Sequence, residues 1–186
     1  MRQFLIACMW FCVIAASGCK KNDSGPTSQT GQFPSGTITA TGPSGEGFSF
    51  SKGTIVTPPF SPDNWPDFIM LYETGSGGPT AVGFAFVGTK NDGTSRPTFR
   101  LLYQIDKLDS AQSTFQILHQ IPDTTFVSST GENQTSAPTM RPYQIYGVKT
   151  YDGRFAKLLV LSNENGPSGV TVAFAWVYQP DGSRQL

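Results

Sequence analysis

Apolar and polar residues alternate along much of the chain after residue 35, a period that is typical of β-strands. In the clearest segment, Val170–Tyr178, large apolar residues occupy every second position and smaller residues fill the positions between them. One face of this strand should carry the large side chains, and the other should lie close to a neighbouring layer. Strands are expected over residues 37–40, 48–51, 55–56, 68–72, 82–87, 99–105, 124–129, 143–151, 154–162 and 170–178.

Turn signals separate these segments. Asp152-Gly153 lies between two alternating segments, which is the strongest short-range signal for a β-hairpin. Gly53 and the Asn91-Asp92-Gly93 sequence predict further turns. Longer loops are expected over residues 58–66, where Pro58, Pro59 and Pro62 interrupt strand pairing, and over residues 75–79, 131–138 and 163–169.

Residues 106–123 fit two interpretations. Leu108, Ala111, Phe115 and Leu118 fall at helical spacing, and Asp109 is a candidate N-cap. The serine and threonine content of the segment favours a strand or irregular structure instead. Both interpretations remain open at the level of sequence.

The number and spacing of the strands predict an all-β domain with two sheets packed in a sandwich-like arrangement. Glycine, proline and polar turn residues are frequent, and aromatic residues make up 12% of the chain. Of the three cysteines, only Cys19 lies outside the first apolar segment. The folded part therefore contains no disulfide and depends on its apolar core.

The first residues resemble a bacterial lipoprotein signal. Arg2 precedes an apolar segment over residues 4–16, which is too short to span about 30 Å of hydrocarbon. Small residues at 16–18 precede Cys19 and resemble a lipobox, in which the signal is cut before the cysteine. Cys19 is then expected to carry fatty acyl chains such as palmitate, whereas an ordinary signal peptide is the alternative.

The polar composition of residues 20–35 predicts a flexible tether, because the segment has too little apolar surface to offset the entropy of ordering. We therefore expect a signal peptide over 1–18, a lipid-anchored linker over 19–35 and an all-β domain over 36–186. The Lys20-Lys21-Asn22-Asp23 sequence loosely resembles signals that place lipoproteins on the cell surface. The alternative is a solvated charge cluster without a sorting role.

Charge and motif content argue against two classes of function, nucleic-acid binding and catalysis. Of the 13 Lys and Arg residues, Arg2 lies in the signal, which leaves 12 against 13 Asp and Glu, so nucleic acid is not an expected partner. The chain contains one histidine, no G-x-S-x-G and no H-E-x-x-H, so we do not expect an enzyme. Asp63 and Asp67, on either side of Trp65, are the one candidate acid/base pair, and ordinary loop carboxylates are the alternative.

Two segments near the C-terminus resemble HmuY-type haem-binding lipoproteins. Residues 146–158 (YGVKTYDGRFAKL) resemble the closing hairpin of that family, and residues 174–184 (FAWVYQPDGSR) resemble its last strand. The resemblance is weaker over residues 48–56 and 65–69. Residues 73–78 (ETGSGG) depart from the family pattern.

The resemblance implies a sandwich-like lipoprotein, anchored in the outer membrane at the cell surface, that takes up haem for iron acquisition and passes it to an outer-membrane receptor. Haem iron in such a site is held by two axial side chains. The candidates here are His119 and Met140, with Arg141 and Tyr143 as flanking residues for a propionate and the porphyrin face. Met70 lies in a continuous apolar segment and is expected in the core. The alternative function is a structural or interaction lipoprotein of the same fold that binds no haem.

Overall fold

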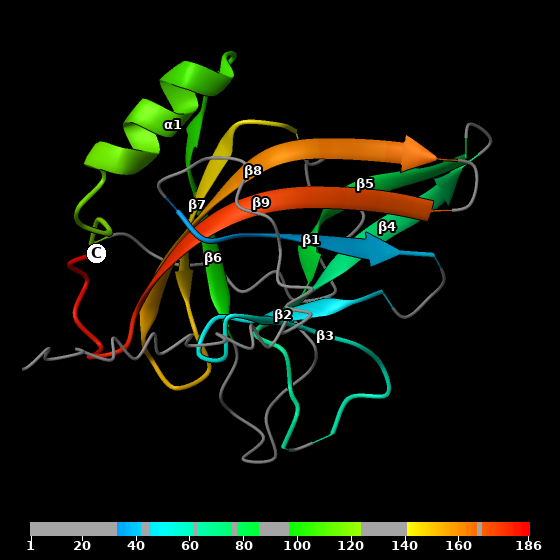
Figure 1. Ribbon diagram of the computed structural model, residues 1–186, viewed down its shortest axis with the longest axis horizontal. Helices are drawn as coiled ribbons and strands as arrows, with labels where there is room; N and C mark the ends of the chain where they lie inside the picture. The colour runs from blue at the N-terminus through cyan, green and yellow to red at the C-terminus, as the bar shows by residue number, and fades with distance from the viewer. Residues whose placement is uncertain are drawn as a thin grey trace, which may run out of the picture.

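Two antiparallel β-sheets form the framework of the protein (Figure 1). The computed structural model describes residues 33–41, 45–61, 63–75, 78–85, 97–123, 141–166 and 169–186. One sheet has five strands in the order β1-β9-β8-β7-β6, and the other has four in the order β3-β2-β4-β5. The predicted all-β, two-sheet fold is therefore confirmed. The strands are β1 Ser35–Ala40, β2 Gly47–Ser49, β3 Thr54–Val56, β4 Phe68–Gly75, β5 Gly78–Ala85, β6 Thr98–Gln104, β7 Gln144–Lys149, β8 Phe155–Gly166 and β9 Gly169–Gln179.

The β7–β8 hairpin forms at the predicted place. Lys149 pairs with Phe155, and the Asp152-Gly153 turn joins the two strands. Gly153 has a φ of +75°, a left-handed conformation that glycine adopts without steric cost. The backbone N–H of Thr150 donates to the carbonyl of Arg154 over 2.8 Å and closes the turn.

Two predicted loops are shorter than expected because the strands continue through them. In place of a loop over 75–79, β4 runs to Gly75, which pairs with Gly78 of β5. In place of a loop over 163–169, β8 and β9 continue to the Gly166–Gly169 pair. The extended end of β8 is exposed or half-buried. Polar residues are therefore tolerated on both faces there, and the apolar alternation that predicts a strand is missing. The predicted strand over 124–129, the turn at 91–93 and the loop over 131–138 lie outside the described residues.

The main core lies between the two sheets and is rich in aromatic side chains. Phe48 of β2 packs edge-on against Phe174 of β9, with 5.0 Å between the ring centres. Phe68 of β4 lies 5.6 Å from the same ring. The large residues at alternate positions of β9 face this core, as the sequence predicts. Met70 joins the cluster at 1% exposure, which confirms its expected core position.

The ambiguous segment forms one helix, α1 Leu108–Ile117, on the outer face of the five-stranded sheet. Phe115 and Ala111 are fully buried against Ala175 of β9 and residues of β7 and β8. The neighbouring layer expected next to the small residues of β9 is therefore this helix. Lys107 occupies the N-cap without a side-chain bond, and Asp109 lies in the first turn, where its charge favours the helix dipole.

Ordered structure begins before residue 36. The Phe33 ring packs edge-on against Phe115 at 5.0 Å, and the carbonyl of Pro34 accepts a hydrogen bond from Trp176 N over 3.1 Å. Both residues fall within the segment predicted as the linker, 19–35. The predicted signal peptide and Cys19 lie outside the described residues. Within the described ranges, no helix is both long enough and apolar enough to cross a membrane.

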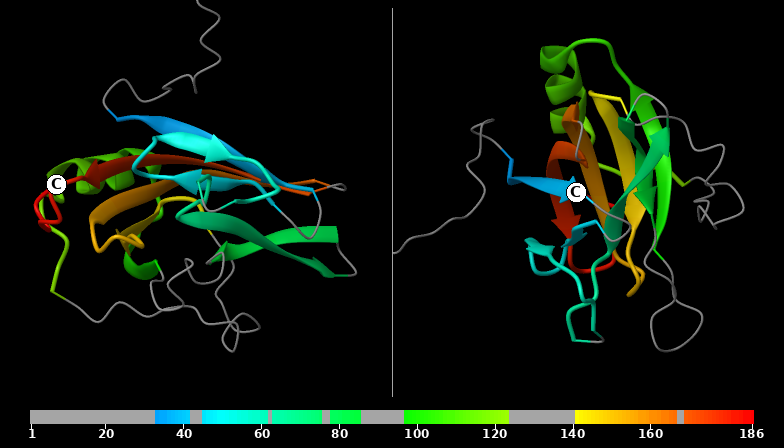
Figure 2. Two further views of the ribbon diagram at one scale, coloured as in Figure 1. Left: turned by 90° about the horizontal axis from the view of Figure 1, so that it is seen from below. Right: turned by 90° about the vertical axis from the view of Figure 1, so that its right-hand side faces the viewer.

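Helix α1 and the β2–β3 pair lie on opposite sides of the molecule (Figures 1 and 2). This separation divides the candidate functional residues into two groups. His119 follows the helix, whereas the segment that carries Asp63 and Asp67 follows β3.

Candidate functional site

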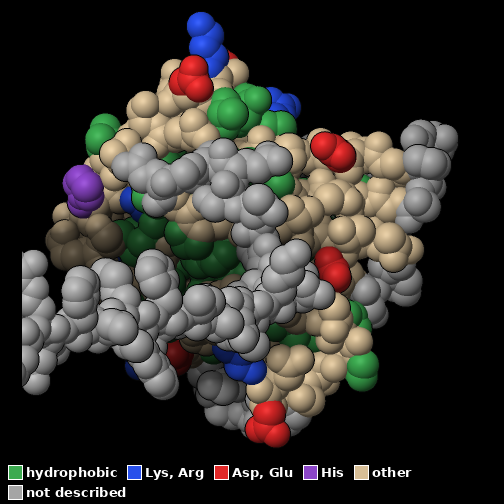
Figure 3. Space-filling view, viewed as in Figure 1, with side chains coloured by type: hydrophobic (Ala, Val, Ile, Leu, Met, Phe, Trp, Pro, Cys, Tyr) green, Lys and Arg blue, Asp and Glu red, His purple; other side chains and the backbone are tan. Residues whose placement is uncertain are grey.

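His119 lies just after the C-terminal end of α1 on a segment with a fixed backbone. Its N–H donates to the carbonyl of Ile117 over 2.9 Å, and its carbonyl accepts from the N–H of Leu186 over 2.7 Å. The side chain is exposed, and the single histidine is the purple group in Figure 3. Among the described residues, no hydrogen bond to its imidazole is present. A ring nitrogen is therefore available to a ligand from solvent.

The end of α1 is held by a buried lysine from the sheet beneath it. Lys157 of β8 is 2% exposed, and its Nζ donates to the carbonyls of Phe115 over 2.5 Å and Leu118 over 2.8 Å. These carbonyls lie in the last turn, where helix carbonyls lack intrahelical partners and the dipole favours a cation. Burial lowers the pKa of Lys157 to about 8. Lys157 therefore fixes the turn from which His119 projects.

Arg141 lies just before β7, beside a buried polar group. The Gln144 side chain is 3% exposed, and its Oε1 accepts hydrogen bonds from Arg141 N over 2.9 Å and from the Tyr146 hydroxyl over 2.8 Å. Burial raises the pKa of Tyr146 to about 12. The Arg141 side chain is exposed and fits a role as partner for an anionic group.

Tyr143 occupies an unusual backbone position. Its φ is +68°, in the left-handed region that residues other than glycine rarely adopt. Its N–H donates to the carbonyl of Val160 over 2.8 Å, and its side chain is half-buried against the cluster beneath α1. Tyr143 therefore helps to join the β7 start to the helix.

The structure does not bring His119 and Arg141 together. Gln144 pairs with Gln104 at the end of β6, shortly before α1 begins, whereas His119 follows the end of α1 (Figure 1). A helix of ten residues is about 15 Å long, so the two candidates lie toward opposite ends of it. Met140, the other candidate axial ligand, lies outside the described residues, as does the proposed lipidation site Cys19.

Asp63 and Asp67 do converge, because both line one cleft together with Trp65. Asp67 is 7% exposed, and its Oδ2 accepts from Phe50 N over 2.7 Å, whereas Asp63 is exposed. Tyr151 and Asp152, from the β7–β8 turn, also line this cleft. The sequence analysis predicted this turn but did not identify Tyr151 and Asp152 as site residues, because nothing in the turn sequence indicates that it lies beside the Trp65 loop.

Comparison with known proteins does not assign a family: no protein-family model matches the chain, and no curated protein matches it. Among the residues that the structure describes, no group of three or more His, Cys, Asp or Glu side chains is arranged to hold a metal ion. Haem iron is held by axial side chains and not by such a cluster, and an exposed histidine is one of the side chains able to serve as an axial ligand.

Proposed function

We propose that the protein is a lipid-anchored lipoprotein of the cell surface that binds haem and passes it to an outer-membrane receptor. The lipobox-like sequence before Cys19 supports the anchor. The resemblance to HmuY-type lipoproteins supports haem as the ligand. The residues that carry it include most of β7, the start of β8 and the second half of β9, three strands that are adjacent in one sheet. The observation that carries the proposal is the exposed imidazole of His119 on a fixed backbone.

The surroundings of His119 suit a flat apolar ligand. Ile117, two residues earlier, is 71% exposed, the highest value among the exposed large apolar residues described. Haem bound through a histidine nitrogen would cover such apolar surface, which is favourable. Arg141, the candidate propionate partner, lies toward the other end of α1, so the proposal rests on His119 as an axial ligand and not on Arg141. Experiment decides whether Met140 supplies the second.

The test is a haem titration of the mature chain with Cys19 replaced by Ser, so that it stays in solution without lipid. We expect a saturable shift of the Soret band at one haem per chain. His119→Ala should abolish the shift, and Gln120→Ala, a neighbouring exposed residue, should retain it. Met140→Ala should change the Soret spectrum if Met140 is the second ligand. A shift that persists unchanged in His119→Ala contradicts the proposal.

A structural or interaction lipoprotein is the second candidate function. It is favoured by the presence of a single histidine in the chain and by its distance from Arg141 along α1. On this alternative, the exposed Ile117 would face a protein partner instead of a porphyrin. Absence of any Soret shift in the titration supports this alternative over haem binding.

A further inference from the structure

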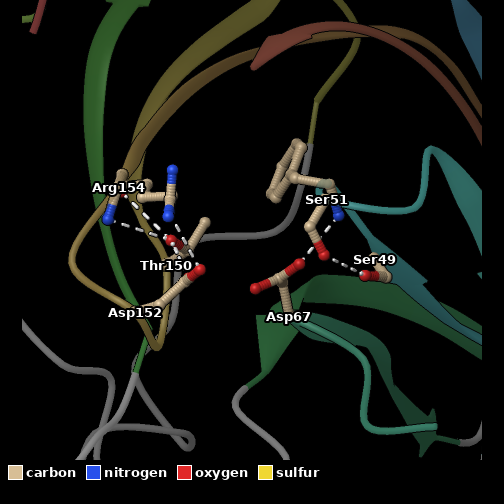
Figure 4. A network of polar contacts seen from close by, with 7 residues as sticks. Ser49, Ser51, Asp67, Thr150, Asp152 and Arg154 are labelled. Atoms are coloured by element: carbon tan, nitrogen blue, oxygen red, sulfur yellow. Dashed lines mark hydrogen bonds and ion pairs between the residues drawn. The ribbon is translucent and has the colours of Figure 1, made fainter. Parts of the chain in front are cut away.

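A cleft on the side of the molecule away from α1 lies between the 57–67 loop and the β7–β8 turn. Its volume is about 150 Å³. In Figure 4, Asp152 and Thr150 from the turn lie opposite Asp67, which directly precedes β4, and Ser51, which follows β2. The cleft is lined by Ser49, Ser51, Lys52, Asp63, Trp65, Asp67, Tyr151 and Asp152.

One wall of the cleft is an aromatic pair in a fixed orientation. The indole Nε1 of Trp65 donates to the hydroxyl of Tyr151 over 2.8 Å, which joins the loop to the turn across 86 positions of sequence. Phe60 packs edge-on against the indole at 6.5 Å between ring centres. Trp65 is half-buried, so part of its ring remains open to the cleft. A fixed aromatic face binds the apolar face of a ligand at a low entropic cost.

Another part of the lining is polar and preformed. The Asp67 carboxylate is buried and held by Phe50 N, and the hydroxyl of Ser49, 3% exposed, lies 3.2 Å from that of Ser51. A carboxylate accepts hydrogen bonds, and a hydroxyl both donates and accepts. This combination, beside an aromatic wall, suits a ligand with several hydroxyl groups on a compact ring.

The charged groups of the cleft are largely paired within the protein. Asp152 accepts from Thr150 Oγ1 over 2.8 Å and from Arg154 Nε over 3.1 Å. The Lys52 ammonium donates to the carbonyl of Asp63 over 2.8 Å. The lining carries the ammonium of Lys52 and the carboxylates of Asp63, Asp67 and Asp152, so it is negatively charged, and Arg154 beside the cleft offsets only Asp152. An anionic ligand is therefore disfavoured, whereas the carboxylates can accept hydrogen bonds from the hydroxyls of a neutral sugar.

We propose that this cleft binds a neutral sugar ring, such as the terminal ring of a glycan. Trp65 contacts the apolar face of the ring, and Asp67 and Ser51 bond its hydroxyls. The site is independent of haem binding, because its lining shares no residue with the surroundings of His119.

The test is a titration of the unlipidated mature chain with methyl β-D-glucopyranoside, methyl β-D-galactopyranoside and methyl α-D-mannopyranoside. The readout is the indole N–H signals in a ¹⁵N NMR spectrum. The chain after the predicted signal contains two tryptophans, Trp65 and the buried Trp176. We expect at least one glycoside to shift the Trp65 signal saturably, while the Trp176 signal stays in place and reports an intact fold.

Variants locate the binding site. Affinity, measured by saturation-transfer NMR on the glycoside, should fall about tenfold or more in Trp65→Ala and in Ser51→Ala. Tyr151→Phe should weaken binding because the indole loses its hydrogen-bond acceptor, whereas Tyr103→Phe, at an exposed tyrosine of β6, should not. The proposal is overturned if no glycoside shifts Trp65, if the variants bind as the parent does, or if lysine methyl ester binds in place of the sugars.

Discussion

The Nζ atom of Lys157 lies 4.6 Å from the centre of the Phe115 ring and donates a hydrogen bond to the Phe115 carbonyl. With its second hydrogen bond, to the Leu118 carbonyl, Lys157 connects β8 of the sheet to the last turn of α1. The lysine is almost fully buried, and its ammonium group is stabilised by two carbonyls and an aromatic face instead of by water. The helix that precedes His119 is therefore coupled to the protonation state of one residue.

The lowered pKa of Lys157 predicts that stability increases in mildly alkaline solution. Stability rises with pH wherever the unfolded chain binds more protons than the folded one. An unfolded lysine keeps its proton up to a pKa of 10.5, whereas folded Lys157 loses it near a pKa of about 8. The free energy of unfolding should thus rise from about pH 8 toward 10.5. Urea unfolding at a series of pH values measures this free energy.

Tyr146 has the opposite effect at higher pH. Its pKa is raised from 10.0 to about 12 in the fold, so the folded chain holds the proton longer and stability falls over that interval. The two effects together place a stability maximum near pH 10.

A pair of lysine variants tests the origin of the alkaline increase. Lys157→Met should remove the increase in unfolding free energy above pH 8, whereas Lys149→Met, at an exposed position of β7, should keep it. An unchanged rise in Lys157→Met would rule out this origin.

Two apolar residues of α1 should differ sharply in their contribution to stability. Phe115 is fully buried beneath the helix, so Phe115→Ala should cost about 3–5 kcal/mol of unfolding free energy. Ile117, two positions later, is 71% exposed, and Ile117→Ala should change stability by less than about 0.5 kcal/mol. Chemical unfolding of both variants makes the comparison. Equal losses would show that the helix does not pack as described.

Gly47 of β2 has no room for a side chain. A Cβ atom there would lie 2.5 Å from Pro66 Cβ and 2.7 Å from the Phe68 carbonyl oxygen. Gly47→Ala should therefore destabilise the protein by about 1–3 kcal/mol through forced displacement. Gly166→Ala is the matched control, because its nearest neighbour would lie at 3.6 Å. Thermal unfolding should show a lower midpoint only for the Gly47 variant.

The hairpin and the last strand could be predicted because their alternation and turn sequence are local signals. Helix α1 was undecided, since the burial of Phe115 depends on residues of the sheet that are distant in sequence. Lys157 was missed as a buried residue because a lysine in an alternating strand usually faces water. Lys157 is buried because α1 covers this part of the sheet and its Phe115 carbonyl accepts a hydrogen bond from the ammonium.

The candidate sites also depend on contacts between residues that are distant in sequence. The exposure of His119 has no local signal, because Ile117, Leu118 and Ile121 near it in sequence are apolar. Its distance from Arg141 along α1 follows from the path of β6 and β7. The convergence of Trp65 with Tyr151 depends on the packing of a loop from one sheet against a turn from the other. Neither relationship is present in any short segment of sequence.

The pairing of β1 with β9 also determines how the domain responds to mechanical force. Six residue pairs, from Ser35–Ala175 to Ala40–Val170, attach β1 to β9. In the proposed anchored state, a pull from the membrane enters the domain at Phe33, next to α1. The Phe33–Phe115 contact and the Pro34–Trp176 hydrogen bond would therefore break before the β1–β9 pairing is stretched.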